Sequence, residues 1–202
     1  PDKYFNRGVV RAELGEYIGA IDDYNKSISL DSLDPDVYNN RGLALFAMGE
    51  LELAVGDFNT AIEIDSTDAI KFDNRALTKT GLLDFEGALE DYNKSVKLFG
   101  EDPDTYNLRG VVKYNLEQYS EAIIDYDLAI SIDPEEALYY DNRAAAKNDS
   151  EDFNGAIEDY TYSIILFPND PETFYFRALA KFGKEDNFDG CFDLQIASDM
   201  GL

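Results

Sequence analysis

Apolar and small residues return at helical spacing along the chain. Within the first 34 residues, two groups of side chains follow one another at intervals of three or four. The groups are Tyr4, Gly8 and Arg11, then Ala20, Tyr24 and Ser27. Such intervals place side chains on one face of an α-helix. The stretch Gly15-Glu16-Tyr17 between the two groups indicates a turn. The pattern therefore predicts two helices joined by a turn.

This unit repeats every 34 residues. An arginine marks position 7 of each unit, at Arg7, Arg41, Arg75, Arg109, Arg143 and Arg177. An aspartate marks position 23, at Asp23, Asp57, Asp91, Asp125, Asp159 and Asp193. Position 4 is aromatic, and positions 8 and 20 are small. We expect a single domain over 1–202 with repeats at 1–34, 35–68, 69–102, 103–136, 137–170 and 171–202.

Turn and capping residues support these boundaries. Asp34-Pro35, Asp102-Pro103 and Asp170-Pro171 each offer an aspartate N-cap followed by proline at the first helical position. The small residues at positions 8 and 20 would let the two helices of a unit approach closely. One hairpin cannot bury its apolar face alone, whereas stacked hairpins can, and a solenoid results.

The pattern resembles the tetratricopeptide repeat family. That family has a bulky aromatic at position 4, small residues at positions 8, 20 and 27, and aromatics near positions 11, 17 and 24. The resemblance covers all 202 residues. It implies an all-α fold, an α-α superhelix that forms a right-handed solenoid of helix-turn-helix hairpins. Two positions of this chain differ from the family pattern: position 7 is Arg, and position 11 is Lys, Arg or Leu. Phe188 comes one residue late in the last unit, so we expect a one-residue distortion there.

The matched arginines and aspartates have two interpretations. With the turn near position 15, positions 7 and 23 of one unit face each other across the hairpin. They would then form an internal ladder of ion pairs. The alternative is an arginine row that binds a ligand. We favour the ladder, because a free arginine row would not need a matched aspartate row.

The net charge narrows the class of partner. The chain has 17 basic and 42 acidic residues, a net charge of −25, while 14 Tyr and 13 Phe argue against disorder. Nucleic acid and anionic membrane surfaces are disfavoured, because both are bound through Lys and Arg. No apolar run is long enough for a membrane span. A protein or peptide with basic residues remains, and the field would speed its encounter with the chain.

The sequence lacks most of the residue types and motifs that catalytic sites use. The chain has no His and no phosphate-binding Gly-rich loop. Acidic clusters such as Asp31, Asp34 and Asp36 fall where helix caps are needed, and they lack calcium-loop spacing. Cys191 is expected to be a small packing residue. We expect no enzyme activity, cofactor or metal site. Because the chain begins at Pro1 and not at Met, we expect it to be a segment of a longer protein.

The family resemblance also implies a site. In that family the first helix of each unit lines a concave groove through positions 2, 5, 9, 12 and 13. The corresponding residues here are Phe5, Val9, Asn39, Leu43, Phe46, Asp73, Leu77, Asn107, Val111, Tyr114, Asp141, Tyr175, Leu179 and Phe182. They predict an apolar floor with amides, carboxylates and acidic edges. Two alternatives stay open: the position 9 side chains only pack adjacent helices together, and the asparagines at position 5 only face water.

The expected function is therefore a protein-protein interaction scaffold that binds a peptide segment or a partner protein with apolar anchors and basic residues. A clamp for the C-terminal carboxylate of chaperones is not expected. Members with that function pair Lys at position 5 with Asn at position 9, whereas this chain begins with Phe5 and Val9. The alternatives are a substrate-recruiting region of a larger enzyme or sensor, and a self-associating assembly module.

Overall fold

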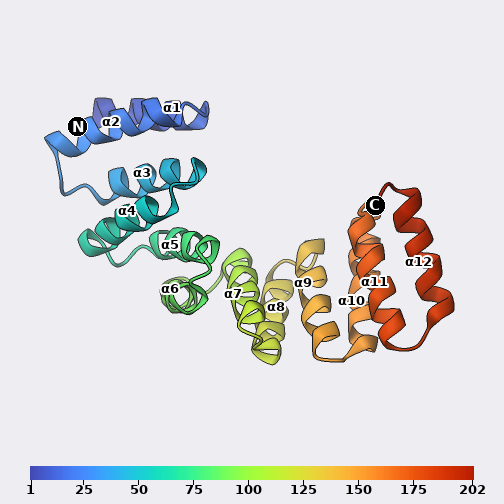
Figure 1. Ribbon diagram of the computed structural model, residues 1–202. Coiled ribbons are helices and arrows are strands. Elements are labelled where there is room, and N and C mark those ends of the chain that lie inside the picture. The colour runs from blue at the N-terminus through green and yellow to red at the C-terminus, as the bar shows by residue number, and fades with distance from the viewer. The chain divides into compact units, whose positions relative to one another are not determined.

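A computed structural model describes residues 1–202 and contains twelve α-helices and no strand (Figure 1). The all-α prediction is confirmed. The helices are α1 (Asp2–Glu13), α2 (Tyr17–Leu30), α3 (Pro35–Ala47), α4 (Leu51–Ile64), α5 (Ala69–Gly81), α6 (Phe85–Leu98), α7 (Pro103–Asn115), α8 (Tyr119–Ile132), α9 (Ala137–Asp149), α10 (Phe153–Leu166), α11 (Pro171–Gly183) and α12 (Asn187–Asp199). None of them is both long and apolar enough to cross a membrane.

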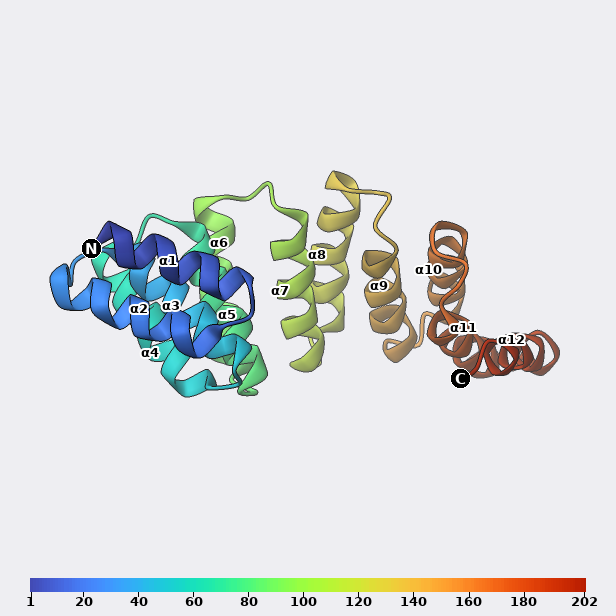
Figure 2. The same ribbon diagram turned by 90° about the horizontal axis from the view of Figure 1, so that it is seen from above.

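The chain forms two compact units, Pro1–Gly100 with α1–α6 and Glu101–Leu202 with α7–α12. Each unit holds three hairpins, and each predicted repeat range contains one hairpin. Within a unit, the second helix of one hairpin packs against the first helix of the next (Figures 1 and 2). This is the nearest-neighbour packing of a solenoid. The expectation of one domain over 1–202 stays a prediction.

Side-chain caps begin many of the helices, as the sequence predicts. The carboxylate of Asp34 accepts a hydrogen bond from the backbone N–H of Asp36, and Asp170 does the same for Glu172. Pro35 and Pro171 occupy the first helical position of α3 and α11. The acidic clusters therefore satisfy backbone donors that a helix start leaves free.

Close contact within each hairpin depends on the small residues at positions 8 and 20. A Cβ atom added to Gly110 would lie 2.6 Å from the ring of Tyr126, a distance that real side chains essentially never adopt. Ala122 and Ala129, which lie on α8 with Tyr126, are fully buried. The aromatic ring at position 24 therefore fills the space that the missing side chain leaves.

The expected distortion in the last repeat is wrong. Helix α12 begins at Asn187, which is position 17 of its repeat, as in every other hairpin. Arg177 pairs with Asp193 in the normal register, and Gly190 lies against the ring of Phe182. These two contacts hold the register. The misplaced aromatic Phe188 therefore points to solvent and is 85% exposed.

The packing role predicted for Cys191 is also wrong, because Cys191 is exposed. It occupies position 21. The equivalent residues Ile123 and Ile157 are partly buried, and each lies on a helix that a following hairpin covers. Within this chain no helix follows α12. A packing position without its neighbour becomes a surface position.

Candidate functional site

The arginine–aspartate ladder is confirmed in all six hairpins. In the fifth repeat, Nε and Nη2 of Arg143 donate to the two carboxylate oxygens of Asp159 at 2.8 and 2.7 Å. The other five pairs have the same two-bond geometry. Planar bidentate contacts of this kind are the strong form of an ion pair. Because both partners lie within one hairpin, the ladder joins its two helices.

The arginines are also tied to their surroundings. Each guanidinium lies 5.5–5.7 Å from the ring of the position 4 aromatic. In four repeats the remaining Nη1 donates to the position 25 side chain of the preceding hairpin: Arg41 to Asn25, Arg75 to Asn59, Arg143 to Asp127 and Arg177 to Thr161. In these four arginines all three guanidinium nitrogens donate to side chains within the protein, so the structure favours the ladder over the ligand-binding row.

Position 11 supplies a second cation that the sequence analysis noted only as a departure from the family. Lys79, Lys113, Lys147 and Lys181 each lie 2.7–2.8 Å from the aspartate of their own hairpin, and Arg11 does the same with Asp23. The second repeat is the exception, because Leu45 holds this position. A lysine four residues after the arginine in each of the last four repeats was the signal in the sequence.

A buried lysine joins the second and third repeats. Lys71, at position 3, is 2% exposed, and its ammonium lies 2.8 Å from Asp68, 3.3 Å from Asp65 and 3.4 Å from Asp36. The equivalent positions carry Val37 and Thr105, which are also buried. Three carboxylates offset the burial of the charge. The sequence analysis assigned no role to this residue.

In the first unit, the predicted groove residues lie on α1, α3 and α5. Val9 and Leu43 line a hollow of about 310 Å³ together with Tyr17 and Tyr24. Leu43 and Leu77 are 40% and 38% exposed. The remaining predicted residues of this unit are Phe5, which contacts the ring of Tyr24, Asn39, which accepts a hydrogen bond from Asn74, and the partly buried Phe46 and Asp73. The position 9 leucines Leu43 and Leu77 are thus accessible to solvent, and their role in binding stays a prediction.

In the second unit, the predicted residues lie on α7, α9 and α11. Tyr175 and Leu179 are 38% and 39% exposed. Several others are engaged inside the fold: Asn107 is 5% exposed and accepts from Asn142, Tyr114 donates to Asp149 at 2.5 Å, Val111 packs against the core of Ala122, Tyr126 and Ala146, and Phe182 lies on Gly190. The position 5 asparagines therefore bond to the next repeat, an arrangement that neither sequence alternative anticipated.

The last predicted residue, Asp141, lines a pocket of about 350 Å³ between α9 and α11. Its walls include Tyr114, Tyr160 and Phe176. Burial raises the pKa of the Asp141 carboxyl to about 6, although hydroxyl groups nearby act in the opposite direction. This carboxylate is therefore unlike the ladder aspartates, whose charge is neutralised by bonded cations.

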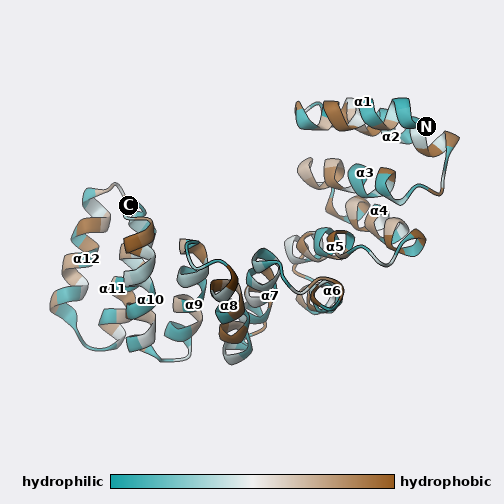
Figure 3. Ribbon diagram, turned by 180° about the vertical axis from the view of Figure 1, so that it is seen from behind, coloured by the Kyte–Doolittle hydropathy of each residue, from teal (hydrophilic) through white to brown (hydrophobic).

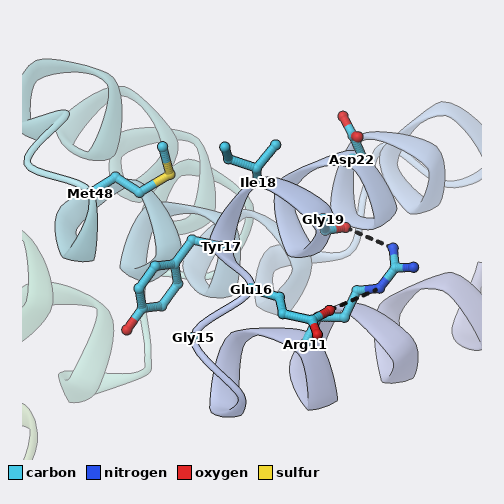
Figure 4. A pocket seen from close by; sticks show the side chains of 8 residues that line it. All are labelled: Arg11, Gly15, Glu16, Tyr17, Ile18, Gly19, Asp22 and Met48. Carbon is cyan, nitrogen blue, oxygen red and sulfur yellow. Dashed lines mark hydrogen bonds and ion pairs between the residues drawn. The ribbon is translucent and has the colours of Figure 1, made fainter.

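A larger hollow of about 570 Å³ lies outside the turn of the first hairpin (Figure 4). Figure 4 shows the Arg11 side chain turned toward Gly19 and Glu16. Its Nη1 donates to the Gly19 carbonyl at 3.1 Å, and its Nε lies 3.9 Å from Glu16. The basic group of this hollow is thus engaged within the hairpin, and we assign no site to it.

Exposed apolar residues also occur on a second helix. Ile124, Leu128 and Ile132 follow each other at intervals of four on α8 and are 58%, 38% and 44% exposed. Figure 3 shows that much of α8 is apolar. The spacing in the sequence was the available signal, and it was not used. No group of three or more His, Cys, Asp or Glu side chains in the structure is arranged to hold a metal ion.

Helix hairpins with one bonding scheme, repeated six times, define the class of protein as an all-α repeat protein. One family model described as "TPR repeat" matches residues 8–49, and two described as "Tetratricopeptide repeat" match residues 35–68 and 103–136. The chain is a tetratricopeptide repeat protein, as these matches and the six hairpins together show. The resemblance seen in the sequence is confirmed.

Solved structures show the same fold at low sequence identity. A tetratricopeptide repeat protein from Parabacteroides merdae has a TM-score of 0.87 and 19% identity, over 100% of this chain and 80% of that one. YrrB, described as a TPR protein with an unusual peptide-binding site, has a TM-score of 0.76 and 20% identity, over 88% and 92%. MamA from Desulfovibrio magneticus has a TM-score of 0.79 and 17% identity, over 82% and 94%. Among the curated proteins, no sequence matches this chain.

Proposed function

We propose that this protein is an interaction scaffold whose first helices bind a peptide segment of a partner protein. The observation that carries the proposal is the row of half-exposed leucines at position 9, Leu43 and Leu77 in the first unit and Leu179 in the second. The ladder residues, by contrast, bond to each other. YrrB, a structure with the same fold, is described as having a peptide-binding site. The exposed leucines of position 9 are the apolar contacts that the first helices offer a partner.

The charge of the chain sets the chemistry of the partner. With a net charge of −25, the protein attracts basic segments and repels acidic ones. Apolar contacts at position 9 would supply most of the affinity, while charge complementarity would raise the association rate and select the partner. We therefore propose a segment that combines apolar anchors with Lys or Arg. The recruiting region of a larger enzyme and the self-associating module stay predictions.

The test uses labelled amphipathic peptides of leucine and lysine, with matched peptides that carry glutamate in place of lysine. We expect the basic set to bind, and we expect Leu43→Asp or Leu77→Asp to weaken binding by about tenfold, because each removes one buried apolar contact. Fluorescence anisotropy measures both effects.

Leu53→Asp is the matched control. Leu53 is 60% exposed and lies on α4, a second helix, so this variant adds the same charge away from the proposed surface. An equal loss of binding in Leu53→Asp, or equal binding of the acidic peptides, would contradict the proposal.

A further inference from the structure

The pocket beside Asp141 is built from carboxylates and aromatic rings. Asp141 and Asn142 of α9 lie on one side, and Thr173 and Phe176 of α11 lie on the other. Tyr160 of α10 also lines the pocket. Two further carboxylates, Asp170 and Glu172, belong to the wall, whereas no Lys or Arg does. The pocket is therefore selective for positive charge.

The Tyr160 hydroxyl has no partner of its own. Tyr160 is 3% exposed and lines the pocket, and its hydroxyl makes no hydrogen bond within the protein. The Tyr160 hydroxyl is not one of the fully enclosed unpaired oxygens of the protein, so it is accessible from the pocket, where water or a ligand can supply the hydrogen bond. This group is thus a polar contact that the fold leaves unused.

Asp141 is also incompletely paired. Its carboxylate oxygens lie 3.3 and 3.4 Å from the Thr173 hydroxyl, but that hydroxyl lies closer to Asp170, at 2.8 Å. Because a threonine hydroxyl has one proton to donate, the shorter contact takes it. Asp170 also caps α11 through the N–H of Glu172. The Ser163 hydroxyl on α10 also lies near Asp141 and favours its ionised form, but no cation is among the groups that act on this carboxylate.

We propose that the Asp141 pocket binds the cationic side chain of a lysine or arginine from the bound peptide segment. This inference rests on the proposed function and adds a subsite to it. The ammonium or guanidinium group would contact Asp141 and the Tyr160 hydroxyl. The side-chain methylenes would lie along the rings of Tyr114 and Phe176, an arrangement that suits both the apolar stem and the charge.

The position of Asp141 among other acids makes binding dependent on pH. The charged and polar groups around it come from every neighbouring element: Asp170, Glu172 and Thr173 from α11 and its start, Tyr114 from α7, Tyr160 and Ser163 from α10, and Glu135 and Glu136 from the segment before α9. Burial holds the pKa of its carboxyl at about 6 in the free protein. A cation is attracted only to the ionised form. Binding should therefore weaken as pH falls from 7.5 through 6.

The experiment titrates the isotope-labelled protein with Nα-acetyl-lysine methylamide and Nα-acetyl-arginine methylamide, followed by amide chemical shifts. The neutral analogues with norleucine and citrulline side chains are the matched ligands. We expect saturable shifts confined to residues around 141, 145, 173 and 176 with the two cations, and no saturable shifts there with the neutral analogues. Asp141→Asn should weaken cation binding by about tenfold or more, and Tyr160→Phe by less.

Glu158→Gln is the control variant, because it removes the same charge from an exposed position on α10 outside the pocket. It should leave cation binding within about twofold of the parent, since screened surface charges act weakly at this range. The amide spectrum of each variant without ligand shows whether it is folded.

Three outcomes would contradict the proposal that the Asp141 pocket binds a cationic side chain. They are no shifts with either cation, equal shifts with the neutral analogues, or equal weakening of binding in Asp141→Asn and Glu158→Gln. Spermidine binding more tightly than both amino-acid analogues would assign the pocket to a free amine. If the leucine–lysine peptides still bind through Leu43 and Leu77, the scaffold function survives the failure of the pocket. If the cations bind at Asp141 but the leucine–lysine peptides do not bind through Leu43 and Leu77, the pocket stands and the proposed scaffold surface fails.

Discussion

At the scale of single residues, the buried aspartates of this protein fall into two electrostatic classes. Hydrogen bonds from Arg7 lower the pKa of the Asp23 carboxyl. Burial alone would raise the pKa of Asp193, but hydrogen bonds from Arg177 and Lys181 outweigh it and hold that pKa below its usual range. Asp141 has no bonded cation, and burial raises its pKa to about 6. The two classes make opposite contributions to stability as pH changes.

The ladder predicts a context-dependent cost for losing an arginine. Arg41→Met leaves Asp57 without a bonded cation, since position 11 of that repeat is Leu45. We expect it to lower the free energy of unfolding by about 3 kcal/mol. Arg143→Met should cost less, because Asp159 keeps Lys147 at 2.7 Å. Urea denaturation of the variants measures the difference.

The double variant Arg41→Met with Asp57→Leu tests whether the loss of stability comes from the unpaired Asp57 carboxylate, because it also removes that carboxylate. It should be more stable than Arg41→Met alone. If the second substitution lowers stability further, the loss does not come from an unpaired buried aspartate.

Asp141 should show the reverse behaviour. Its pKa is raised on folding, so the folded protein holds more protons than the unfolded chain between pH 4 and 6, and stability falls as pH rises through that window. Asp141→Asn should therefore raise the free energy of unfolding by about 1–2 kcal/mol at pH 7.5, allowing for partial exposure, and by much less near pH 4. Denaturation of both proteins at the two pH values decides this. A variant that is less stable at pH 7.5 would contradict the raised pKa.

At the scale of helices and turns, position 15 has the same conformation in every repeat. Gly15 and Gly49 have positive φ, and so do Leu83, Glu117, Glu151 and Glu185, at 60–66°. In the third repeat, the N–H of Leu83 donates to the Thr80 carbonyl and the N–H of Asp84 donates to the Lys79 carbonyl. These are the two bonds of the Schellman motif that ends a helix. Non-glycine residues adopt this left-handed conformation at a cost.

Leu83→Gly should therefore stabilise the protein by about 0.5–1 kcal/mol, as relief of backbone strain exceeds the added flexibility of the unfolded chain. Leu83 is 72% exposed, so little burial is lost. Leu82→Gly, one residue earlier at φ −86°, is the control and should destabilise. Thermal unfolding compares the two, and stabilisation by both would point to another cause.

The helices and hairpins were predictable because their signals are local. Periodicity, Asp-Pro caps and small residues at positions 8 and 20 act within about one turn or one hairpin, and six copies repeat them. The two errors concern the last repeat. For Phe188, the register was already fixed by Arg177 and Gly190, while Cys191 needed a following hairpin to cover it. Both depend on neighbours in space, which a local pattern does not contain.

The candidate site was less predictable for the same reason. The row of position 9 leucines could be located from the repeat register, and Leu43, Leu77 and Leu179 are half-exposed. The engagement of Asn107 with Asn142, 35 residues away, could not. The unpaired state of Asp141 also depends on which acceptor lies nearer to Thr173. Such competition is decided by tenths of an ångström.

At the scale of the whole molecule, the net charge of −25 opposes folding through self-repulsion. Added salt screens repulsion between exposed carboxylates, whereas the buried bidentate ladder pairs are screened much less. Raising NaCl from low ionic strength to about 0.5 M should therefore raise Tm by about 2–4 °C. Differential scanning calorimetry measures the shift. A fall in Tm would mean that the ion pairs, and not the repulsion, dominate the response to salt.

The bond from four of the arginines to the preceding hairpin has a consequence for how such chains change over generations. The acceptor at position 25 is an amide in Asn25 and Asn59, a carboxylate in Asp127 and a hydroxyl in Thr161. All four side chains offer an oxygen as the acceptor. A hairpin gained or lost as a whole 34-residue unit thus leaves both new neighbours with a matching donor and acceptor. Duplication or deletion of a complete repeat therefore keeps this bond, whereas an insertion of a few residues within a helix would move the donor or the acceptor to another face and break it.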